Sequence, residues 1–321
     1  MTLRCAVLDD YQGVALSMAD WSSLSDAVRV TAIERHFDNQ DDLVAAIADC
    51  QIVVAMRERT PFDAALFDRL PELRLLVTTG RGNASIDLVA AAAHGVTVCG
   101  TTAIAQPTVE LTWALVLGLA RHLVAENTAL RTGGPWQSTI GTDLSGRRLG
   151  LLGLGRIGSR VARVGLAFGM DVVAWSANLT AERAEAEHVT LAGSKAELLE
   201  TSDFVSIHLR LSERTRDLVG AAELALMKPT AYLVNTSRAA IVNQDALVDA
   251  LRAGRIAGAG LDVFEVEPLP ADHPLRSLPT VLATPHLGYV SERNYGENYF
   301  PLVVEDITAY LAGSPIRVLG S

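Results

Sequence analysis

Short runs of β-branched and apolar residues alternate with helical patterns along almost the whole of this 321-residue chain. The first series of runs is CAVL, VRVTAI, QIVVAM, LRLLVTT and VTVCG, separated by helical segments such as DDLVAAIADC and IDLVAAAAHG. A second series is RRLGLLGLG, DVVAW, FVSIHL, AYLVN, IAGAGLDV and TVLATP. Alternating strands and helices predict parallel sheets covered on both faces. We therefore predict an α/β fold with two doubly wound domains, one of five strands and one of six.

The helical segment from about Val290 to Leu311 follows the last strand and has no new sheet to cover. We expect it to return to the first domain, which becomes discontinuous. The predicted organisation is a flavodoxin-like substrate domain (residues 1–101 plus 288–321) and a Rossmann dinucleotide-binding domain (residues 102–287), with a cleft between them.

Charge and hydropathy exclude several classes of partner. The formal charge of −10 and the absence of a Lys/Arg run argue against nucleic acid. The most apolar stretch, VELTWALVLGLARHLVA, is interrupted by Arg121 and His122, and it is short for a membrane span. The N-terminus shows no signal-peptide pattern. The three cysteines are widely spaced, and we expect them to be buried thiols. We expect a cytoplasmic protein without membrane or nucleic-acid partners.

A glycine pattern follows the first strand of the second series. Gly153, Gly155 and Gly158 form G-x-G-x-x-G, with Arg156 and Ile157 inside the pattern. The first glycine permits a tight turn, the second lets a pyrophosphate approach the backbone, and the third allows close packing of helix and strand. Free N–H groups at the helix start then face the phosphates. This context predicts dinucleotide binding.

The next strand, DVVAW, ends at Ser176, where an acid usually holds the adenosine ribose. Asp171 lies at the beginning of that strand and cannot take this place. A serine does not repel the additional phosphate of NADP, and Arg156 or Arg183 could supply a positive charge. The cofactor is therefore expected to be NAD(P)H, with NADP slightly favoured over NAD.

Three later segments place polar residues at or beyond strand ends: LVNTSRAAIVNQDAL with Arg238, GAGLDVFEVEPLP with Asp262 and Glu267, and LATPHLGY with His286. Together with GLGRIG and VSIHLRLSERT they resemble the D-isomer-specific 2-hydroxyacid dehydrogenase family over nearly the full chain. The resemblance implies a dimer with Arg238 on the substrate, a Glu267–His286 pair, and Asp262 beside the nicotinamide amide. Ala239 and the run GYVSERNY depart from the family pattern.

The chemistry of these residue types agrees with that resemblance. Reduction of a 2-oxo acid needs a proton at the carbonyl oxygen, and histidine titrates in the right range to supply it. Glu267 would fix the tautomer of His286, and Arg238 would offer a planar fork to the substrate carboxylate. Taken singly, each residue has an ordinary alternative. His286 could be a loop histidine, Glu267 a solvated turn residue, and Arg238 a member of a surface ion pair.

Further cofactor contacts follow from the resemblance. His208, in VSIHLRL, matches a position beside the nucleotide, although a structural role is equally open. Thr108 begins a helix expected to run to Leu123 at the dimer interface, and it is a candidate contact for the nicotinamide. Thr215 and Thr236 complete the expected cofactor set. The role of Trp136 stays open between loop anchor, packing residue and a group that reaches the partner's active site.

The first domain is expected to complete the substrate site. The loop TTGRGNASID follows a strand, and its glycines can expose N–H groups to an anion. It is similar to the family loop that holds the substrate carboxylate, so Arg81, Gly82 and Asn83 are candidates. Arg57 and Arg59, in MRERT, are further candidates, with a surface salt bridge as the alternative.

The remaining histidines read as surface or helix-end residues without metal-ligand spacing, and we predict no metal. They are His36, His94, His122, His188 and His273.

These expectations converge on an NAD(P)-dependent dehydrogenase that interconverts a small 2-oxo acid and its D-2-hydroxy acid. Glyoxylate, hydroxypyruvate and pyruvate are the expected substrates. Two alternatives remain: a dinucleotide-sensing corepressor or scaffold of the same fold, and a phosphoglycerate dehydrogenase without a regulatory domain.

Overall fold

The computed structural model describes residues 2–320 and separates into two compact units. The first unit is Met1–Ile104 with Val290–Ser321, and the second is Ala105–Tyr289. The boundaries between the units thus fall at residues 104/105 and 289/290. The boundaries expected from the sequence were 101/102 and 287/288. Each unit contains one parallel sheet, and the predicted α/β class is confirmed.

The sheet of the first unit has the strand order β2-β1-β3-β4-β5, with all neighbours parallel. This is the flavodoxin-like order, in which the direction of strand addition reverses between β1 and β3. Its strands are β1 (Leu3–Val7), β2 (Val28–Ala32), β3 (Ile52–Ala55), β4 (Leu75–Thr78) and β5 (Thr97–Gly100).

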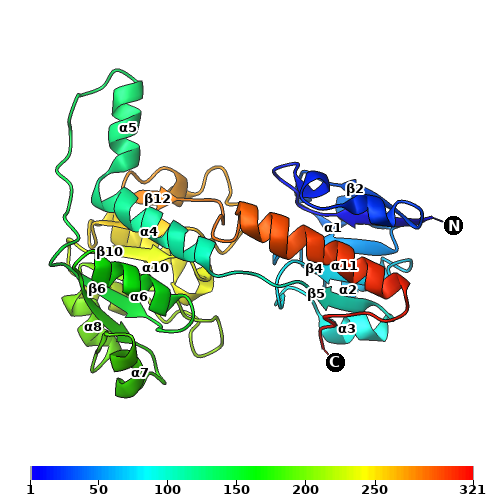
Figure 1. Cartoon of the computed structure of the whole chain (residues 1–321). Helices are drawn as coiled ribbons and strands as arrows, with labels where there is room; N and C mark the ends of the chain where they lie inside the picture. The colour runs from blue at the N-terminus through cyan, green and yellow to red at the C-terminus, as the bar shows by residue number, and fades with distance from the viewer. Residues whose placement is uncertain (1, 321) are drawn as a thin grey trace. The chain divides into compact units, whose positions relative to one another are not determined.

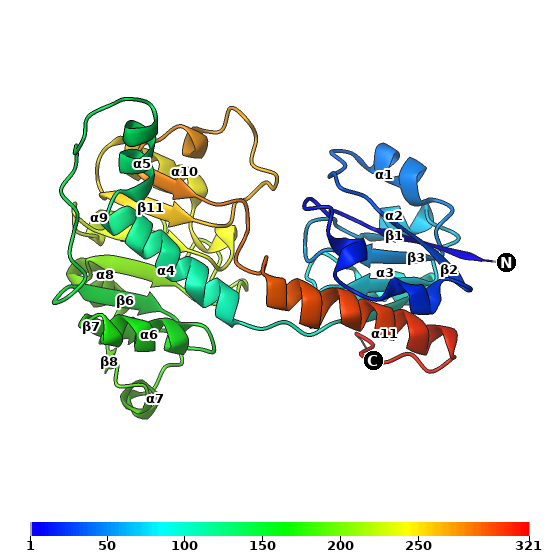
Figure 2. The ribbon, with the colours of Figure 1, turned by 45° about the horizontal axis from the view of Figure 1, so that its top comes forward.

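The helices of the first unit are α1 (Gln40–Ile47), α2 (Ala64–Asp68), α3 (Leu88–Ala93) and α11 (Phe300–Leu311). The side chains of Asn39, Asp63 and Asp87 cap the first three helices by accepting N–H donors of their first turns. The segment expected to be one helix from Val290 begins differently, because a π-helical stretch, Asn294–Tyr299, precedes α11. Helix α11 packs on β4, and Figures 1 and 2 show it lying along the first unit.

The segment after α11 closes the free edge of β5. Gly100 N donates to Arg317 O, and Leu319 N donates to Val98 O, in antiparallel pairing. The Arg317 guanidinium also holds the buried carboxylate of Asp306 on α11, with Nε at 2.9 Å from Oδ1. Burial raises the pKa of Asp306 to about 6, against the opposing effect of Arg317.

Asp306 is expected to make the first unit less stable as pH rises. The folded-state pKa lies above the unfolded value of 3.8, so the stabilising contribution is complete below pH 4 and is lost as pH rises through about 6. The free energy of unfolding should fall by at most about 3 kcal/mol over this pH range. Denaturant unfolding of the wild type and of Asp306→Asn between pH 4 and 7 checks it: the difference in unfolding free energy between them should change by up to this amount. A pH-independent difference would contradict the prediction.

The sheet of the second unit has the order β12-β11-β10-β9-β6-β7-β8 and is parallel throughout. The order reverses between β6 and β9, as in a Rossmann fold. The prediction of six strands missed β8, whose two residues are too few to show a periodicity. The strands are β6 (Arg148–Leu152), β7 (Asp171–Trp175), β8 (Thr190–Leu191), β9 (Phe204–Ile207), β10 (Tyr232–Asn235), β11 (Gly258–Leu261) and β12 (Val281–Ala283).

Helices cover both faces of this sheet. Alternate strand residues enter different cores: Val172 and Ala174 pack in one apolar cluster, and Val173 packs in the other. The helices are α4 (Gln106–Ala120), α5 (Leu123–Arg131), α6 (Gly158–Ala167), α7 (Ala181–Ala186), α8 (Lys195–Thr201), α9 (Ala221–Leu226) and α10 (Gln244–Arg252). Short 3-10 turns occur at Ala15–Ser17, Trp21–Leu24, Ala239–Ile241 and Pro274–Arg276.

The apolar helix expected to reach Leu123 ends at Ala120. His122 adopts left-handed backbone (φ 49°), so α5 leaves at an angle of 65° to α4. Figures 1 and 2 show α5 projecting from the body of the second unit, with an extended segment running back beside it. Within residues 2–320 no single helix is long and apolar enough to cross a membrane, and α4 and α5 meet that length only as this bent pair.

Candidate active site

The glycine loop joins β6 to α6 at the order reversal of the second sheet. Gly153 has φ 104°, and a Cβ there would lie 2.7 Å from the carbonyl oxygen of His208. A Cβ on Gly158 would lie 2.1 Å from the carbonyl oxygen of Gly153, so packing demands glycine at both positions. Gly155 has nothing within 4 Å of such an atom. The open face at Gly155 and the N-terminus of α6 fit the pyrophosphate of a dinucleotide.

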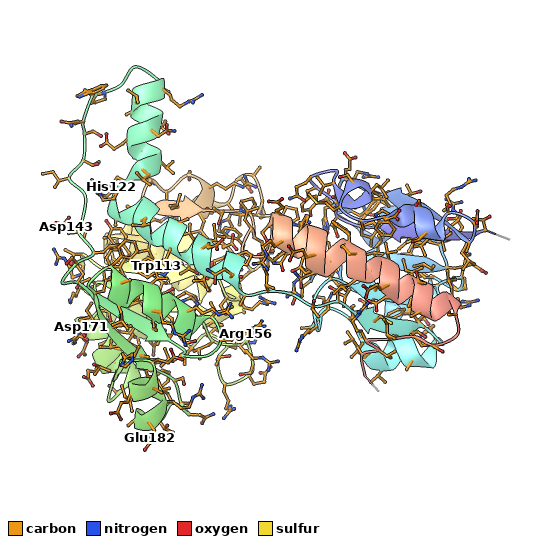
Figure 3. The ribbon with its side chains drawn as sticks, viewed as in Figure 1. Trp113, His122, Asp143, Arg156, Asp171 and Glu182 are labelled. Atoms are coloured by element: carbon orange, nitrogen blue, oxygen red, sulfur yellow. The ribbon has the colours of Figure 1, made fainter. Side chains whose placement is uncertain are left out.

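Three residues of the expected cofactor set lie in or beside this loop, and their contact with a cofactor stays a prediction. His208 follows β9, the neighbour of β6, and its Nε2 lies 2.9 Å from Ser206 Oγ. Burial lowers the pKa of His208 to about 3, so the ring is neutral near pH 7. Arg156 is exposed on the loop, and Ile157 directly precedes α6 without a capping side-chain hydrogen bond; Figure 3 labels Arg156 on the second unit.

The end of β7 contains the expected ribose position. Ser176 follows the last residue of the strand and is half-buried. Arg183, in the first turn of α7, donates from Nη2 to Leu154 O in the glycine loop at 3.4 Å. A guanidinium therefore reaches the glycine loop from α7, the helix that follows Ser176 in the chain. Asp171 lies at the opposite end of β7, paired with Arg148, and Figure 3 shows it far from Arg156.

The loop after β10 presents Arg238. The side-chain amide of Asn235 donates to Arg238 O at 3.0 Å, and its oxygen accepts Ser237 N at 3.0 Å. Arg238 Nη1 donates to Ser237 O at 2.8 Å. The hydroxyl of Thr236 lies 2.8 Å from that of Thr112 on α4. These bonds fix the backbone from which Arg238 projects.

His286 and Glu267 form the predicted pair. Nδ1 of His286 lies 2.6 Å from Oε2 of Glu267, and Oε1 of Glu267 accepts Phe264 N at 2.8 Å. Both side chains are partly exposed, at 20% and 28%. The rings of His286 and Tyr289 form an edge-to-face pair, with ring centroids 5.2 Å apart. The carboxylate therefore fixes Nδ1 and leaves Nε2 as the nitrogen that can act on a substrate.

Asp262 anchors the loop that carries His286. Its buried carboxylate accepts Thr284 Oγ1 at 2.6 Å and Leu287 N at 2.7 Å on Oδ1, and Gly288 N at 2.8 Å on Oδ2. Burial raises the pKa of Asp262 in spite of these bonds. Thr108 Oγ1 donates to Gly288 O at 2.8 Å, which ties the start of α4 to the same loop. The nicotinamide contacts expected of Asp262 and Thr108 stay predictions.

Thr215 closes a turn within its own loop. Its hydroxyl donates to Arg210 O at 2.7 Å and accepts Ser212 N at 2.8 Å. These bonds fix the conformation of the segment after β9. The contact of Thr215 with a cofactor stays a prediction.

In the first unit the candidate substrate residues divide into two groups. Asn83 donates from Nδ2 to Arg57 O at 2.5 Å and to Thr78 Oγ1 at 3.0 Å, so its side chain joins the loops after β3 and β4. The Arg57 guanidinium donates to Thr79 O at 3.0 Å and also pairs with Glu58 at 3.5 Å. Arg81 and Gly82 are exposed, and a Cβ on Gly82 would meet nothing within 4 Å. The open backbone expected for an anion is therefore that of residues 81 and 82.

One contact of the first unit, between a half-buried histidine and a buried aspartate, was not expected. His36, assigned from sequence to the surface, is 18% exposed, and its Nδ1 lies 2.9 Å from Oδ1 of the buried Asp9. The two residues are 27 positions apart and share no motif. The only sign of this contact in the sequence is the pair of acidic residues, Asp9 and Asp10, that follows the first strand. Within residues 2–320 no group of three His, Cys, Asp or Glu side chains has the geometry to hold a metal ion.

Comparison with known proteins places this geometry in a family. Residues 113–288 match the model described as D-isomer specific 2-hydroxyacid dehydrogenase, NAD binding domain. A glyoxylate reductase of Aeropyrum pernix is 44% identical over 233 residues, which cover 70% of this chain and 69% of the relative. A glyoxylate reductase of Korarchaeum cryptofilum is 35% identical over 301 residues, covering 88% and 90%. The crystal structure of a phosphoglycerate oxidoreductase from Vibrio cholerae superposes with a TM-score of 0.92 at 35% identity, covering 98% and 100%.

Proposed function

Because the chain belongs to the D-isomer-specific 2-hydroxyacid dehydrogenase family, we propose that it reduces a small 2-oxo acid to the D-2-hydroxy acid with NAD(P)H. Glyoxylate, hydroxypyruvate and pyruvate are the proposed substrates, and two relatives named glyoxylate reductase support the first. The single observation that carries the proposal is the Glu267–His286 pair, at 2.6 Å and oriented by Phe264 N.

In the proposed reaction the bound nicotinamide supplies the hydride to the carbonyl carbon. His286, protonated at Nε2, donates its proton to the carbonyl oxygen as the negative charge develops there. Glu267 accepts the hydrogen bond from Nδ1–H, which fixes the tautomer and stabilises the imidazolium. In the reverse direction the same Nε2 removes the proton of the hydroxyl group.

Arg238 is proposed to bind the substrate carboxylate, because a guanidinium forms paired hydrogen bonds with a planar anion. The backbone N–H groups at residues 81 and 82 are proposed to provide further donors to the substrate. Gly153, Gly155 and Gly158 are proposed to receive the pyrophosphate through the loop and the start of α6.

Steady-state kinetics with NADH and NADPH over a panel of 2-oxo acids tests the proposal. For hydroxypyruvate and pyruvate, whose products are chiral, chiral chromatography determines the configuration; glycolate, the product of glyoxylate, has no stereocentre. Turnover of at least one small acid is expected, with the D product wherever the product is chiral. Tight dinucleotide binding without turnover of any acid would refute the reductase and favour a dinucleotide-sensing corepressor or scaffold.

Phosphoglycerate oxidation is the second candidate, and similarity to the Vibrio cholerae phosphoglycerate oxidoreductase favours it. Including 3-phosphohydroxypyruvate in the same panel separates the two. A kcat/KM for this phosphorylated acid well above that for glyoxylate and hydroxypyruvate would establish the second candidate.

The cofactor preference is proposed to depend on Ser176 and Arg183, with NADP favoured over NAD. Arg183→Ala is expected to raise the Kd of NADPH about tenfold and to change that of NADH little, because only NADPH has a phosphate on the 2′ oxygen of the adenosine ribose. Ser176→Asp is expected to shift preference toward NADH. Fluorescence titration with both cofactors measures this. An equal change for both cofactors would place these residues outside the phosphate site.

A homodimer is proposed through residues 123–141, here named the arm. Helix α5 buries none of its residues, and Trp136 and Ile140 are 81% and 94% exposed. The arm has internal order, because the carboxylate of Glu126 accepts Ser138 Oγ at 2.9 Å and Thr139 Oγ1 at 2.6 Å. An ordered arm with large apolar side chains in water is typical of an interaction surface. The cytoplasmic location stays a prediction.

Replacing Trp136 and Ile140 together by serine is expected to raise the dimer dissociation constant at least about 100-fold, because each apolar side chain contributes about 1.5–3 kcal/mol when buried. Size-exclusion chromatography with light scattering measures it. Val89→Ser is the control, because Val89 is an equally exposed apolar residue of the first unit, at 81%. A monomeric wild type, or a double variant that stays dimeric, would contradict the proposal.

A further inference from the structure

Two strained residues mark the order reversal of the first sheet. Asp9 follows β1 with φ 55°, and Arg57 follows β3 with φ 54°. The two strands are neighbours, and the strand order reverses between them. Open α/β sheets bind ligands beyond the carboxyl ends of strands at such a reversal. Left-handed backbone in a residue other than glycine is strained, and strain of this kind is concentrated at functional sites.

The Asp9 side chain connects the loops that follow three strands. It is 1% exposed, and its Oδ1 lies 2.9 Å from Nδ1 of His36, beyond β2. Its Oδ2 accepts the hydroxyl of Thr60, beyond β3, at 2.6 Å. A buried carboxylate needs such partners, since loss of one leaves an uncompensated charge in the interior. Asp9, His36 and Thr60 therefore fix the loops after β1, β2 and β3 to one another.

The backbone of Asp9 in turn orients Arg59. Its carbonyl oxygen accepts Nη1 of Arg59 at 2.6 Å, and the guanidinium lies 4.3 Å from the centroid of the Tyr11 ring. The left-handed turn at Asp9 sets the direction of this carbonyl group. The guanidinium is thus held at the same carboxyl edge as the exposed loop of Arg81 and Gly82. A guanidinium held in this way is suited to a planar anion.

The π-helical stretch contacts the loop that follows β1. Tyr295, within Asn294–Tyr299, places its hydroxyl 3.4 Å from Oε1 of Gln12, in the loop after β1. Tyr295, Gln12 and Val290 line a cavity of about 230 Å³ in the first unit. Short π-helical segments occur frequently at functional sites.

We propose that Asp9, His36 and Thr60 are positioning residues for substrate binding, because they fix the loops after β1 and β3 and thereby hold Arg59 ready for the anionic end of a 2-oxo acid. This inference rests on the proposed function and adds residues that act through Arg59 without touching the substrate. Their loss therefore affects binding of the acid and leaves the proton transfer at His286 intact.

Protonation of His36 gives the positioning a pH dependence. The hydrogen bond to Asp9 raises the pKa of His36, in spite of burial, and the charged groups that face the ring are Asp9, Asp38 and Arg59. The folded-state pKa is raised, so the charged pair is complete below the ordinary value of about 6.5 and is lost as pH rises through the raised value. The KM for the 2-oxo acid should rise with pH over that range.

His36→Gln and Asp9→Asn test the inference in the full-length protein with the 2-oxo acid that the wild type turns over fastest. Asparagine suits the left-handed position, which limits damage to the fold. Each variant is expected to raise KM about tenfold with kcat changed less than about twofold, and His36→Gln should lose the part of the rise in KM with pH that follows the titration of His36. The Kd of NADH, which reports on the second unit, should not change.

His94→Gln is the matched control. His94 Nε2 lies 2.8 Å from Asp68 Oδ1 in the same unit, a histidine–aspartate pair away from the strand ends, and its loss should leave KM unchanged. If Asp9→Asn does not fold, Thr60→Val is held to the same criterion. Folded variants with a wild-type KM at every pH would overturn the inference and leave the proposed function standing. A wild type that reduces no acid would overturn both.

Discussion

Replacing His286 with alanine is expected to lower kcat for 2-oxo acid reduction by about 1,000-fold and to leave the Kd of the dinucleotide nearly unchanged. The size of the loss is that of a general acid–base group. The selectivity follows from the geometry, because Glu267 fixes Nδ1 and leaves Nε2 to the substrate. Stopped-flow or steady-state kinetics gives kcat, and fluorescence titration gives the Kd.

His188→Ala is the matched control for this result. His188 is exposed, and like His286 it adopts left-handed backbone, with φ 57° against 53°. Its replacement changes a histidine in the same conformation without touching the site, and kcat should stay at the wild-type value. If His286→Ala lost cofactor affinity as strongly as kcat, the histidine would be a structural residue.

Replacing Asp262 with alanine is expected to lower the free energy of unfolding of the second unit by about 3–5 kcal/mol. Three donors lose their acceptor in a buried place: Thr284 Oγ1, Leu287 N and Gly288 N. An unsatisfied buried donor costs about 1–3 kcal/mol. Since these donors flank His286, kcat should fall as well. Urea unfolding followed by circular dichroism measures the stability.

Asp171→Ala provides the comparison for Asp262→Ala. Asp171 begins β7 and forms an ion pair with Arg148, in which the side chains are 46% and 36% exposed. Exposed pairs contribute at most about 1 kcal/mol, so this variant should be nearly as stable as the wild type. A loss below about 1 kcal/mol for Asp262→Ala would mean that water takes over the role of the carboxylate.

The parts of the molecule that could be predicted are those with local signals. The glycine loop and the Glu267–His286 pair are encoded in short motifs, so their place at strand ends followed from strand prediction. The second sheet was predicted except for β8, because two residues contain no alternation. The break at His122 was also missed, since no glycine or proline marks a left-handed residue there.

Interactions between residues far apart in the sequence could not be predicted, because no local motif encodes them. Asp9 and His36 lie in different loops, and only the pairing of β1 with β2 brings them together. Asn83 lies in a glycine-containing loop of the kind that binds anions, yet its side-chain amide joins two loops within the first unit. Chemical type suggests what a side chain can do, and its neighbours decide which of those bonds it forms.

The discontinuity of the first unit has a consequence for how the chain folds during synthesis. Strand β4 is covered by α11, which the ribosome makes roughly 220 residues later. The second unit is continuous from Ala105 to Tyr289 and has its own apolar cores, so it can fold while the first sheet still exposes an apolar face. A chain truncated after residue 289 should then contain a protease-resistant second unit and bind holdase chaperones through residues 1–104.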